Sequence, residues 1–151
     1  MARKQAMHFR ERLRALLETR TRFWKTHPVV MALTLATALV WLLFGIWFKV
    51  FGMVPRHRQI VAAVVGEAGA GPVTVLIGAA EIAMALWILS GVYPRACAAL
   101  QSIAIVTMNA LELTLAHELL LAPILMLCAN TVFLIVVWYC ALKTPPAQSL
   151  T

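Results

Sequence analysis

The sequence predicts an all-α fold, a four-transmembrane-helix bundle, and three observations support this class. Hydrophobic residues make up 62% of the 151 residues, whereas soluble domains contain roughly 45–50% apolar residues. Charged residues make up 13%, which is too few to cover the surface of so small a soluble domain. Long apolar runs replace the alternation of apolar and polar residues that a membrane β-barrel requires. We therefore expect an integral membrane protein in contact with the lipid bilayer.

A basic N-terminal segment, residues 1–28, precedes the first apolar run. Residues 2–24 predict an amphipathic helix, because apolar side chains such as Phe9, Leu13 and Leu16 recur at spacings of three and four. Eight of the 13 Lys and Arg residues fall in this segment. Such a helix fits the inner face of a membrane, against anionic lipids; the alternatives are a solvated tail or a surface that contacts a partner subunit.

Four apolar stretches have a length that suits a spanning helix, which takes about 20 residues. They lie within a transmembrane domain of residues 29–143, followed by a tail of residues 144–151, and cover residues 29–48, 72–90, 96–116 and 124–142. Between the first two, Pro55–Val65 predicts a short re-entrant or interfacial helix, because its apolar part is too short to cross. The glycines and the proline of residues 66–72 predict a flexible connector before the second span.

The distribution of Lys and Arg predicts that both termini are cytoplasmic, in a bacterial-type inner membrane. With this orientation the inner segments hold ten Lys and Arg residues and the outer segments hold three, namely Lys49, Arg56 and Arg58. The net charge of +7 therefore reflects residues that flank spans, and nucleic acid is not an expected partner. Because the three outer cations break the charge rule, we expect them to neutralise acids in the spans.

Polar side chains in three of the spans are the candidates for a site. Glu81 lies inside the second span, Asn109 and Glu112 share one face of the third, and Asn130 lies inside the fourth. At about 1.5 Å of helix per residue, all four lie in the outer half of the membrane. Ionisable groups in hydrocarbon normally face the interior of the bundle and are paired. The sequence therefore predicts a polar pocket that opens to the outer side.

The predicted ligand-binding residues of this pocket are Glu81, Asn109, Glu112, Asn130, Lys49, His57 and Trp87, with Trp41 as a further wall. Polar groups above an apolar wall suit an amphiphile such as a quinone or a lipid. The alternative is that these side chains only hold the helices together through hydrogen bonds. The sequence predicts no metal site. The sequence requires no cofactor, and a bound quinone is the candidate that such a pocket suggests.

The three cysteines, Cys97, Cys128 and Cys140, form no C-x-x-C pair and no zinc-binding spacing. All three lie in or at the ends of apolar runs. We therefore expect them to be small buried hydrophobic residues.

Several stretches resemble the DoxX-like family of small four-helix membrane proteins. They are Gly45–Phe51 (GIWFKVF), Pro55–Val65 (PRHRQIVAAVV), Gly78–Arg95 (GAAEIAMALWILSGVYPR) and Gln101–Leu113 (QSIAIVTMNALEL). The resemblance runs from about residue 38 to residue 143 and implies four transmembrane helices. The positions that match the family's polar pattern are Lys49, His57, Glu81, Arg95, Asn109, Glu112 and Asn130. The basic N-terminal segment departs from the family pattern, as does Ala129, where members often carry a lysine.

The resemblance implies a loose link to membrane redox chemistry, through a relative that resembles a subunit of a thiosulfate:quinone oxidoreductase. We therefore expect a quinone- or lipid-binding small subunit or partner of a membrane oxidoreductase. Whether the chain is itself an enzyme, and whether it forms a homo-oligomer, the sequence leaves open. The alternatives are a non-enzymatic assembly or scaffold subunit and a proton-linked carrier of small solutes. The first hypothesis assigns proton handling to Glu81 and Glu112, head-group hydrogen bonds to Asn109 and Asn130, and closure to Lys49 and His57.

Overall fold

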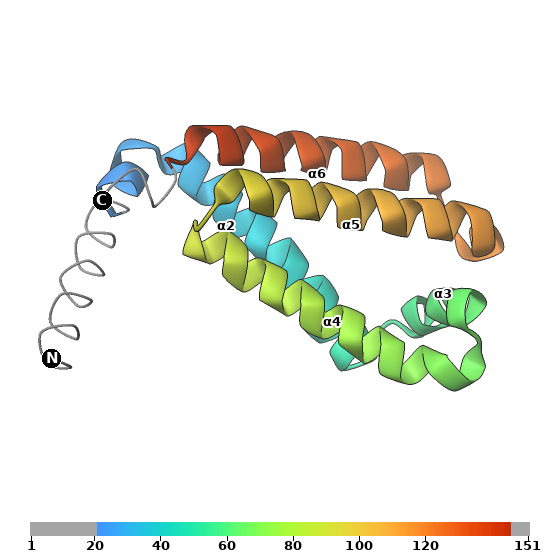
Figure 1. Ribbon diagram of the computed structural model, residues 1–151. Helices are drawn as coiled ribbons and strands as arrows, with labels where there is room; N and C mark the ends of the chain where they lie inside the picture. The colour runs from blue at the N-terminus through green and yellow to red at the C-terminus, as the bar shows by residue number, and fades with distance from the viewer. Residues whose placement is uncertain (1–20, 146–151) are drawn as a thin grey trace, which may run out of the picture.

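The structure is a computed structural model that describes residues 21–145, and every regular element in this range is helical. The helices are α2 (Pro28–Leu42), η1 (Leu43–Val50), α3 (Pro55–Val65), α4 (Glu67–Ser90), α5 (Pro94–Leu115), η2 (His117–Leu119) and α6 (Pro123–Lys143) (Figure 1). Residues 21–26 are also helical. The rest of the predicted amphipathic helix, residues 2–20, lies outside the described residues.

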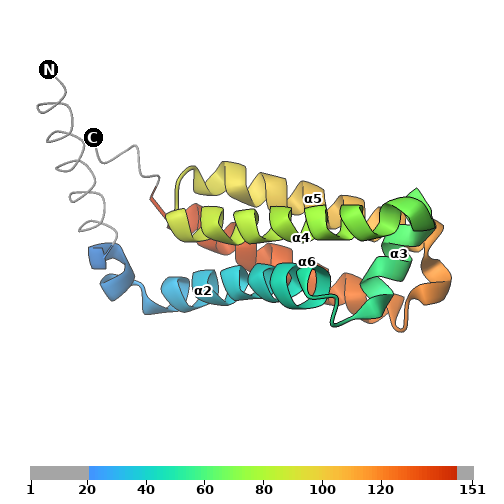
Figure 2. The same ribbon diagram turned by 90° about the horizontal axis from the view of Figure 1, so that it is seen from below.

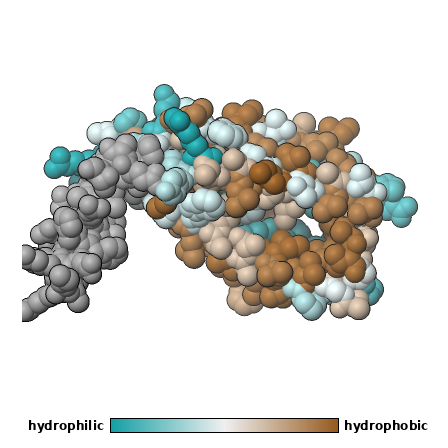
Figure 3. All heavy atoms as spheres, viewed as in Figure 1, coloured by the Kyte–Doolittle hydropathy of each residue, from teal (hydrophilic) through white to brown (hydrophobic). Residues whose placement is uncertain are grey.

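Four helices are long and apolar enough to span a membrane: Pro28–Val50, which combines α2 and η1, followed by α4, α5 and α6. Large apolar side chains on these helices point outward, such as Leu76 with 69% and Ile124 with 78% of its surface exposed. Lipid tails cover such side chains as well as a protein core would. In Figure 3 apolar side chains dominate the middle of the surface, while the hydrophilic ones gather toward its ends. The prediction of an all-α, multi-pass membrane protein is confirmed.

The four long helices form two pairs that meet at one end of the molecule and diverge toward the other (Figure 1). α4 packs on α2 and η1, while α5 packs on α6, and α2 also touches α6. α4 and α5 are joined by the tight turn of residues 91–93 and touch much less than the members of each pair. We call the end with this turn the closed end, and the opposite end, with η1, α3 and the start of α4, the open end.

α3 lies at the open end, between the two pairs. It contacts α4 and η1 of one pair and α5 and η2 of the other, and Figure 2 shows it beside the link between α5 and α6. Its bounds, Pro55–Val65, are those that the sequence predicts for the short additional helix. Gly66 then reverses the chain with φ at +81°, a left-handed value that glycine adopts without a steric penalty.

The predicted flexible connector of residues 66–72 is wrong, because α4 already begins at Glu67 and continues through Pro72. Pro72 lies close to the start of the helix, where its ring removes one of the first backbone hydrogen bonds. Ala70 has no exposed surface and Thr74 only 5%. These tertiary contacts outweigh the poor helix propensity of the glycines and the proline.

The end of the first span, η1, is a π-helix of eight residues. The N–H of Phe51 donates to the carbonyl of Ile46, five residues earlier, at 2.9 Å. Within η1, Gly45 lies so close to α4 that a Cβ atom there would be 2.7 Å from the carbonyl oxygen of Gly78. Small residues at such a crossing allow two membrane helices to approach closely, and π-helical turns are frequent at functional sites.

The best-packed core lies between the middle of the bundle and its closed end. Its buried residues are Ala38, Trp41, Met84, Ala85, Cys97 and Ile105. Cys97 and Cys140 are buried, as expected, but Cys128 is exposed. The expectation is wrong for Cys128 because this position lies on an outward face of α6.

Candidate ligand-binding site

A buried ion pair joins the first and second spans at the open end. Lys49 Nζ in η1 donates to Glu81 Oε1 in α4 at 2.6 Å, and the two side chains are only 6% and 5% exposed. Gly45 and Gly78 lie about one helical turn before the two charged residues, so the close helix crossing brings the charges together. The expected neutralisation of Glu81 by an outer cation is therefore present.

The second carboxylate oxygen of Glu81, Oε2, is buried and has no hydrogen-bond partner among residues 21–145. Buried polar atoms are nearly always paired, and an unpaired one costs about 1–3 kcal/mol. The ammonium of Lys49 has three N–H donors, and its one described hydrogen bond goes to Glu81 Oε1. Within the described chain the ion pair therefore contains one buried acceptor atom without a partner, next to an ammonium group with a single described hydrogen bond.

Aromatic rings from η1 pack between the ion pair and α3. The ring of Phe48 stacks on the imidazole of His57 with centroids 5.5 Å apart. Phe44 meets Phe48 at 4.9 Å and His57 at 6.0 Å, edge to face in both cases. Lys49 Nζ lies 5.6 Å from the centre of the Phe44 ring, within range of a cation–π interaction. These contacts hold α3 against η1 and place the imidazole near the ammonium group.

His57 is a neutral side chain near pH 7. Burial lowers its pKa most, the charges of Lys49 and Arg56 lower it further, and the backbone of Val54 acts in the opposite direction, so that the pKa falls from 6.5 to about 4. Its Nδ1 atom is buried with no hydrogen-bond partner in the described part of the chain. A neutral imidazole offers one donor and one acceptor. His57 can therefore form hydrogen bonds at the site but does not add a positive charge.

Glu112 brings an acid from the third span to the same end of the molecule. Its half-buried carboxyl group interacts electrostatically with Lys49 and with Arg56. Both predicted acids, Glu81 and Glu112, therefore lie within electrostatic reach of the same lysine. In the space-filling view an opening separates the two helix pairs near this end, with hydrophilic atoms along its edge (Figure 3).

The two predicted asparagines bind each other. Asn130 Nδ2 in α6 donates to Asn109 Oδ1 in α5 at 2.7 Å, in a half-buried position. Hydrogen bonds of this kind hold membrane helices together. For this pair the geometry fits the alternative that the side chains only hold the helices together, because each amide has its partner on the neighbouring helix.

The predicted wall residues Trp41 and Trp87 lie away from the ion pair, which corrects the expected pocket. Trp87 is six residues from Glu81, about 9 Å further along α4, and its indole N–H donates to the carbonyl of Val92 in the closed-end turn. Trp41 donates to Gln101 Oε1 at 2.9 Å. Both rings are held by partners near the closed half of the bundle.

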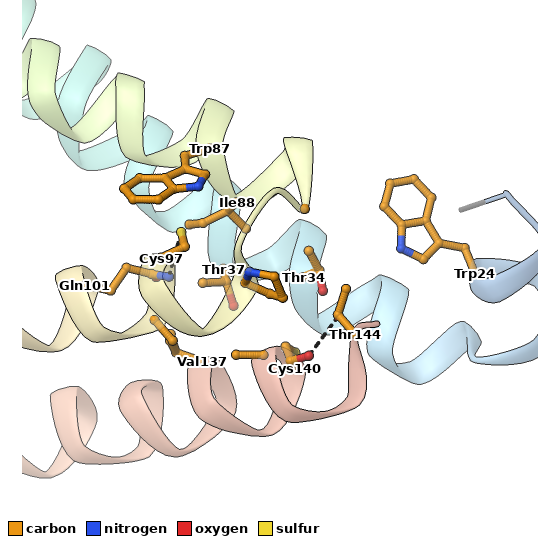
Figure 4. A pocket seen from close by; sticks show the side chains of 14 residues that line it. Trp24, Thr34, Thr37, Trp87, Ile88, Cys97, Gln101, Val137, Cys140 and Thr144 are labelled. Carbon is orange, nitrogen blue, oxygen red and sulfur yellow. Dashed lines mark hydrogen bonds between the residues drawn. The ribbon is translucent and has the colours of Figure 1, made fainter. Parts of the chain in front are cut away.

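Trp87 instead lines a small cavity of about 40 Å³ at the closed end. Figure 4 shows Thr34 and Thr37 from α2, Cys97 from α5 and Cys140 from α6 around it. Both threonine hydroxyls donate to carbonyls of their own helix, so they offer only acceptor lone pairs to the cavity. A polar cavity of this size can hold a few water molecules. The two threonines, three residues apart in an apolar run, are the sequence signal for this polar lining.

The remaining outer cation, Arg58, forms a surface ion pair with Glu67 at 3.2 Å, with side chains 57% and 78% exposed. Pairs exposed to this degree contribute little to stability. Among residues 21–145, no group of three or more His, Cys, Asp or Glu side chains is placed to hold a metal ion.

Sequence reasoning did not identify four residues that shape the site: Gly45, Gly78, Phe44 and Phe48. The glycines set the distance between η1 and α4, and the phenylalanines hold His57. A usable signal was present, because each glycine precedes a charged residue of a span by about one helical turn. Which helices face each other is a property of the fold, however, and a single sequence does not display it.

Comparisons with known proteins agree with this architecture. The model of the DoxX-like family matches residues 38–138, a stretch that contains the whole open-end site. No curated protein and no solved structure matches the chain. The family match covers about two thirds of the sequence. The chain therefore belongs to the DoxX-like family.

Proposed function

We propose that this protein binds the head group of an isoprenoid quinone, or of a similar amphiphile, at the open end. In this proposal it acts as a small subunit or partner of a membrane oxidoreductase. The observation that carries the proposal is the buried Lys49–Glu81 pair, whose ammonium group has N–H donors beyond its one described hydrogen bond. Ionisable residues within membrane spans are costly, and they commonly mark functional sites.

The surroundings of the pair suit an amphiphilic ligand. The divergence of the two helix pairs would let a lipid-soluble molecule enter from the side, with its tail among the outward apolar side chains. Phe44 offers an apolar ring beside the ammonium group, and Phe48 packs against Phe44. Glu112 adds a second carboxyl group from the other helix pair.

We also propose that the protein resides in a bacterial-type inner membrane with both termini cytoplasmic. Arg22 and Lys25 precede the first span, Arg95 follows the closed-end turn and Lys143 ends α6. These cations lie at the closed end, as the positive-inside rule requires of the cytoplasmic side. Two of the three outer cations have acidic partners, since Lys49 pairs with Glu81 and Arg58 with Glu67. The open end then faces the non-cytoplasmic side.

The proposal is tested by measuring the affinity of the purified protein for a short-tail benzoquinone. The site variant is Lys49→Met/Glu81→Gln, which removes both charges and roughly keeps the side-chain volumes. The matched control is Arg58→Met/Glu67→Gln, which makes the same kind of change at the exposed ion pair. We expect the control to bind like the wild type and the site variant to bind at least about tenfold more weakly, since hydrogen bonds to charged groups contribute about 1.5–3 kcal/mol.

Mass spectrometry of the molecules retained after gentle detergent extraction provides a second readout. Quinone should accompany the wild type and the control but not the site variant. Equal affinity and equal retention in all three proteins would refute a binding role for the pair.

A further inference from the structure

The hydrogen-bonding groups left unused at the open end restrict the chemistry of its ligand. We infer that this site binds a neutral head group that carries a hydroxyl group, in preference to the corresponding carbonyl compound. The inference rests on the proposed function and names the class of head group that the same site would select.

The ion pair leaves one oxygen of Glu81 outside its own hydrogen bond. Lys49 Nζ and Glu81 Oε1 are 2.6 Å apart, the distance of a charge-assisted hydrogen bond between an ammonium and a carboxylate. Glu81 Oε2 is then a buried atom that can only accept a hydrogen bond. Since it belongs to the same carboxylate, it lies beside the remaining N–H donors of Lys49.

A hydroxyl group and a carbonyl group would bind differently beside Lys49 and Glu81 Oε2. A hydroxyl oxygen can accept a hydrogen bond from Lys49 and at the same time donate its proton to Glu81 Oε2. A carbonyl oxygen can accept from Lys49, but it then brings its lone pairs next to Oε2 and leaves that atom unpaired. Burial of an unpaired polar atom is unfavourable, so the hydroxyl form is the better partner.

The charges at the open end also restrict the head group. The positive charge of Lys49 is compensated by the carboxylate of Glu81, with which it forms the ion pair. His57 adds no charge, because its neighbours and its burial keep it neutral. An anionic head group such as a phosphate would therefore have to compete with Glu81 for the positive charge of Lys49. The site favours a neutral molecule.

Two kinds of membrane molecule carry such a hydroxyl group: a hydroquinone and an acylglycerol. The ring of Phe44 lies 5.6 Å from the ammonium nitrogen and meets the ring of Phe48 edge to face, and such rings can pack against an aromatic head. The shared chemistry is a neutral hydroxyl donor at the end of an apolar tail. Arms of the experiment with each molecule distinguish the two sources.

The test uses the full-length protein in detergent and a matched pair of probes that differ by two hydrogen atoms. Dissociation constants are measured for a short-tail benzoquinol, kept reduced under argon, and for its benzoquinone. We expect the quinol to bind about tenfold more tightly, which corresponds to about 1.4 kcal/mol. A monoacylglycerol of similar tail length is the third ligand, and displacement of the quinol by it would support the hydroxyl chemistry with a lipid as the source.

Variants locate the preference. In Glu81→Gln the side chain still offers Lys49 an acceptor, but an amide N–H₂ takes the place of the second oxygen and can donate to a carbonyl. We expect the quinol preference to fall to within about twofold, while Glu67→Gln on the exposed part of the same helix keeps it. If Glu81→Gln does not fold, the hydroxyl preference is tested by comparing the binding of quinol and quinone to the wild type.

Failure of the hydroxyl preference and failure of the proposed function give different binding results. Equal or tighter binding of the quinone by the wild type would overturn the hydroxyl preference and leave the proposed function standing. A quinol preference that survives Glu81→Gln would also overturn it. Binding of none of the three ligands, quinol, quinone or monoacylglycerol, would refute the proposed function itself.

Discussion

At the scale of single residues, the Lys49–Glu81 pair is a costly feature that the fold has to hold in place. Both side chains are almost fully buried within spans, and each charge is tolerated because the other compensates it. The cation–π contact with Phe44 and the close glycine crossing support the same geometry. Removal of one partner should therefore have a larger effect than removal of both.

We predict that Lys49→Met destabilises the protein by roughly 3–5 kcal/mol, because Glu81 is left as a buried, unpaired acid. The double variant Lys49→Met/Glu81→Gln should recover a large part of this loss, since no charge then remains unpaired. Thermal unfolding in detergent, followed by circular dichroism, measures both. A single variant as stable as the double variant would contradict the buried pairing.

His57 makes a second residue-scale prediction, on pH. Its pKa is about 4 in the folded protein against 6.5 as the ordinary value, so the unfolded state binds more protons between these values. The contribution of neutral His57 to stability is therefore complete above about pH 6.5 and is lost as the pH falls toward 4. The charges near it are Lys49 on η1 and Arg56 on α3, and Glu112 on α5 interacts with both.

The measurement is the unfolding temperature as a function of pH for the wild type and for His57→Phe, which keeps an aromatic ring for stacking. We expect the wild type to lose stability below pH 6.5 more steeply than the variant. The other described histidines, His27 and His117, are present in both proteins, so their contributions cancel in the comparison. Parallel curves would show that His57 is not held neutral.

The sequence predicts which residues belong to the site better than it predicts which of them contact one another. Ionisable residues in or next to apolar runs are conspicuous, which is why Glu81, Glu112 and Lys49 could be named in advance, while His57 could be named because it lies in the polar segment after the first span. The pairing of the two asparagines with each other and the place of Trp87 at the closed end could not, because they depend on how each helix is rotated toward its neighbours.

At the scale of elements, the crossing of η1 and α4 is the contact that sets the site. Added Cβ atoms would lie 2.7 Å from the Gly78 carbonyl if placed at Gly45, and 2.8 Å from the Gly45 carbonyl if placed at Gly78. Such distances to backbone atoms cannot be relieved by rotating a side chain. The two helices would have to separate.

We predict that Gly78→Ala destabilises the protein by about 1–3 kcal/mol, as overpacking does, and that it also weakens ligand binding at the ion pair. The matched control is Gly71→Ala in the same helix, where an added Cβ meets nothing within 4 Å and helix propensity favours alanine. Unfolding temperatures and quinone affinities are compared for both. Equal effects of the two substitutions would contradict the close crossing.

Local signals predict most of the element boundaries. Pro55 and Gly66 delimit α3 as the sequence suggests, and the apolar runs locate the four spans to within a few residues, except at the start of α4. That start is missed because Gly69, Gly71 and Pro72 predict a break that tertiary packing overrides. The π-helical form of η1 has no recognisable sequence signal, since it depends on the neighbouring helix as well.

At the scale of the whole molecule, the closed end and the open end of the bundle differ in composition. The closed end holds the apolar cluster, the turn after α4 and the small threonine-lined cavity. The open end carries the ion pair, α3 and the second acid, in the part of the bundle where the pairs diverge. Composition and hydropathy predict the membrane class and the four spans, but the divergence of the pairs follows from side-chain packing across the chain and emerges only in three dimensions.

In our proposal, an amphiphile binds at the open end, beside Lys49 and Glu81. Photo-crosslinking tests it most directly: a quinone with a photoreactive diazirine near its head group is activated on the protein, and labelled peptides are identified by mass spectrometry. We predict labels within residues 44–57 and 78–84, and their loss in Lys49→Met/Glu81→Gln. Labels confined to the closed-end cavity around Thr34 and Cys140, or spread evenly over the outward faces of the spans, would contradict the claim.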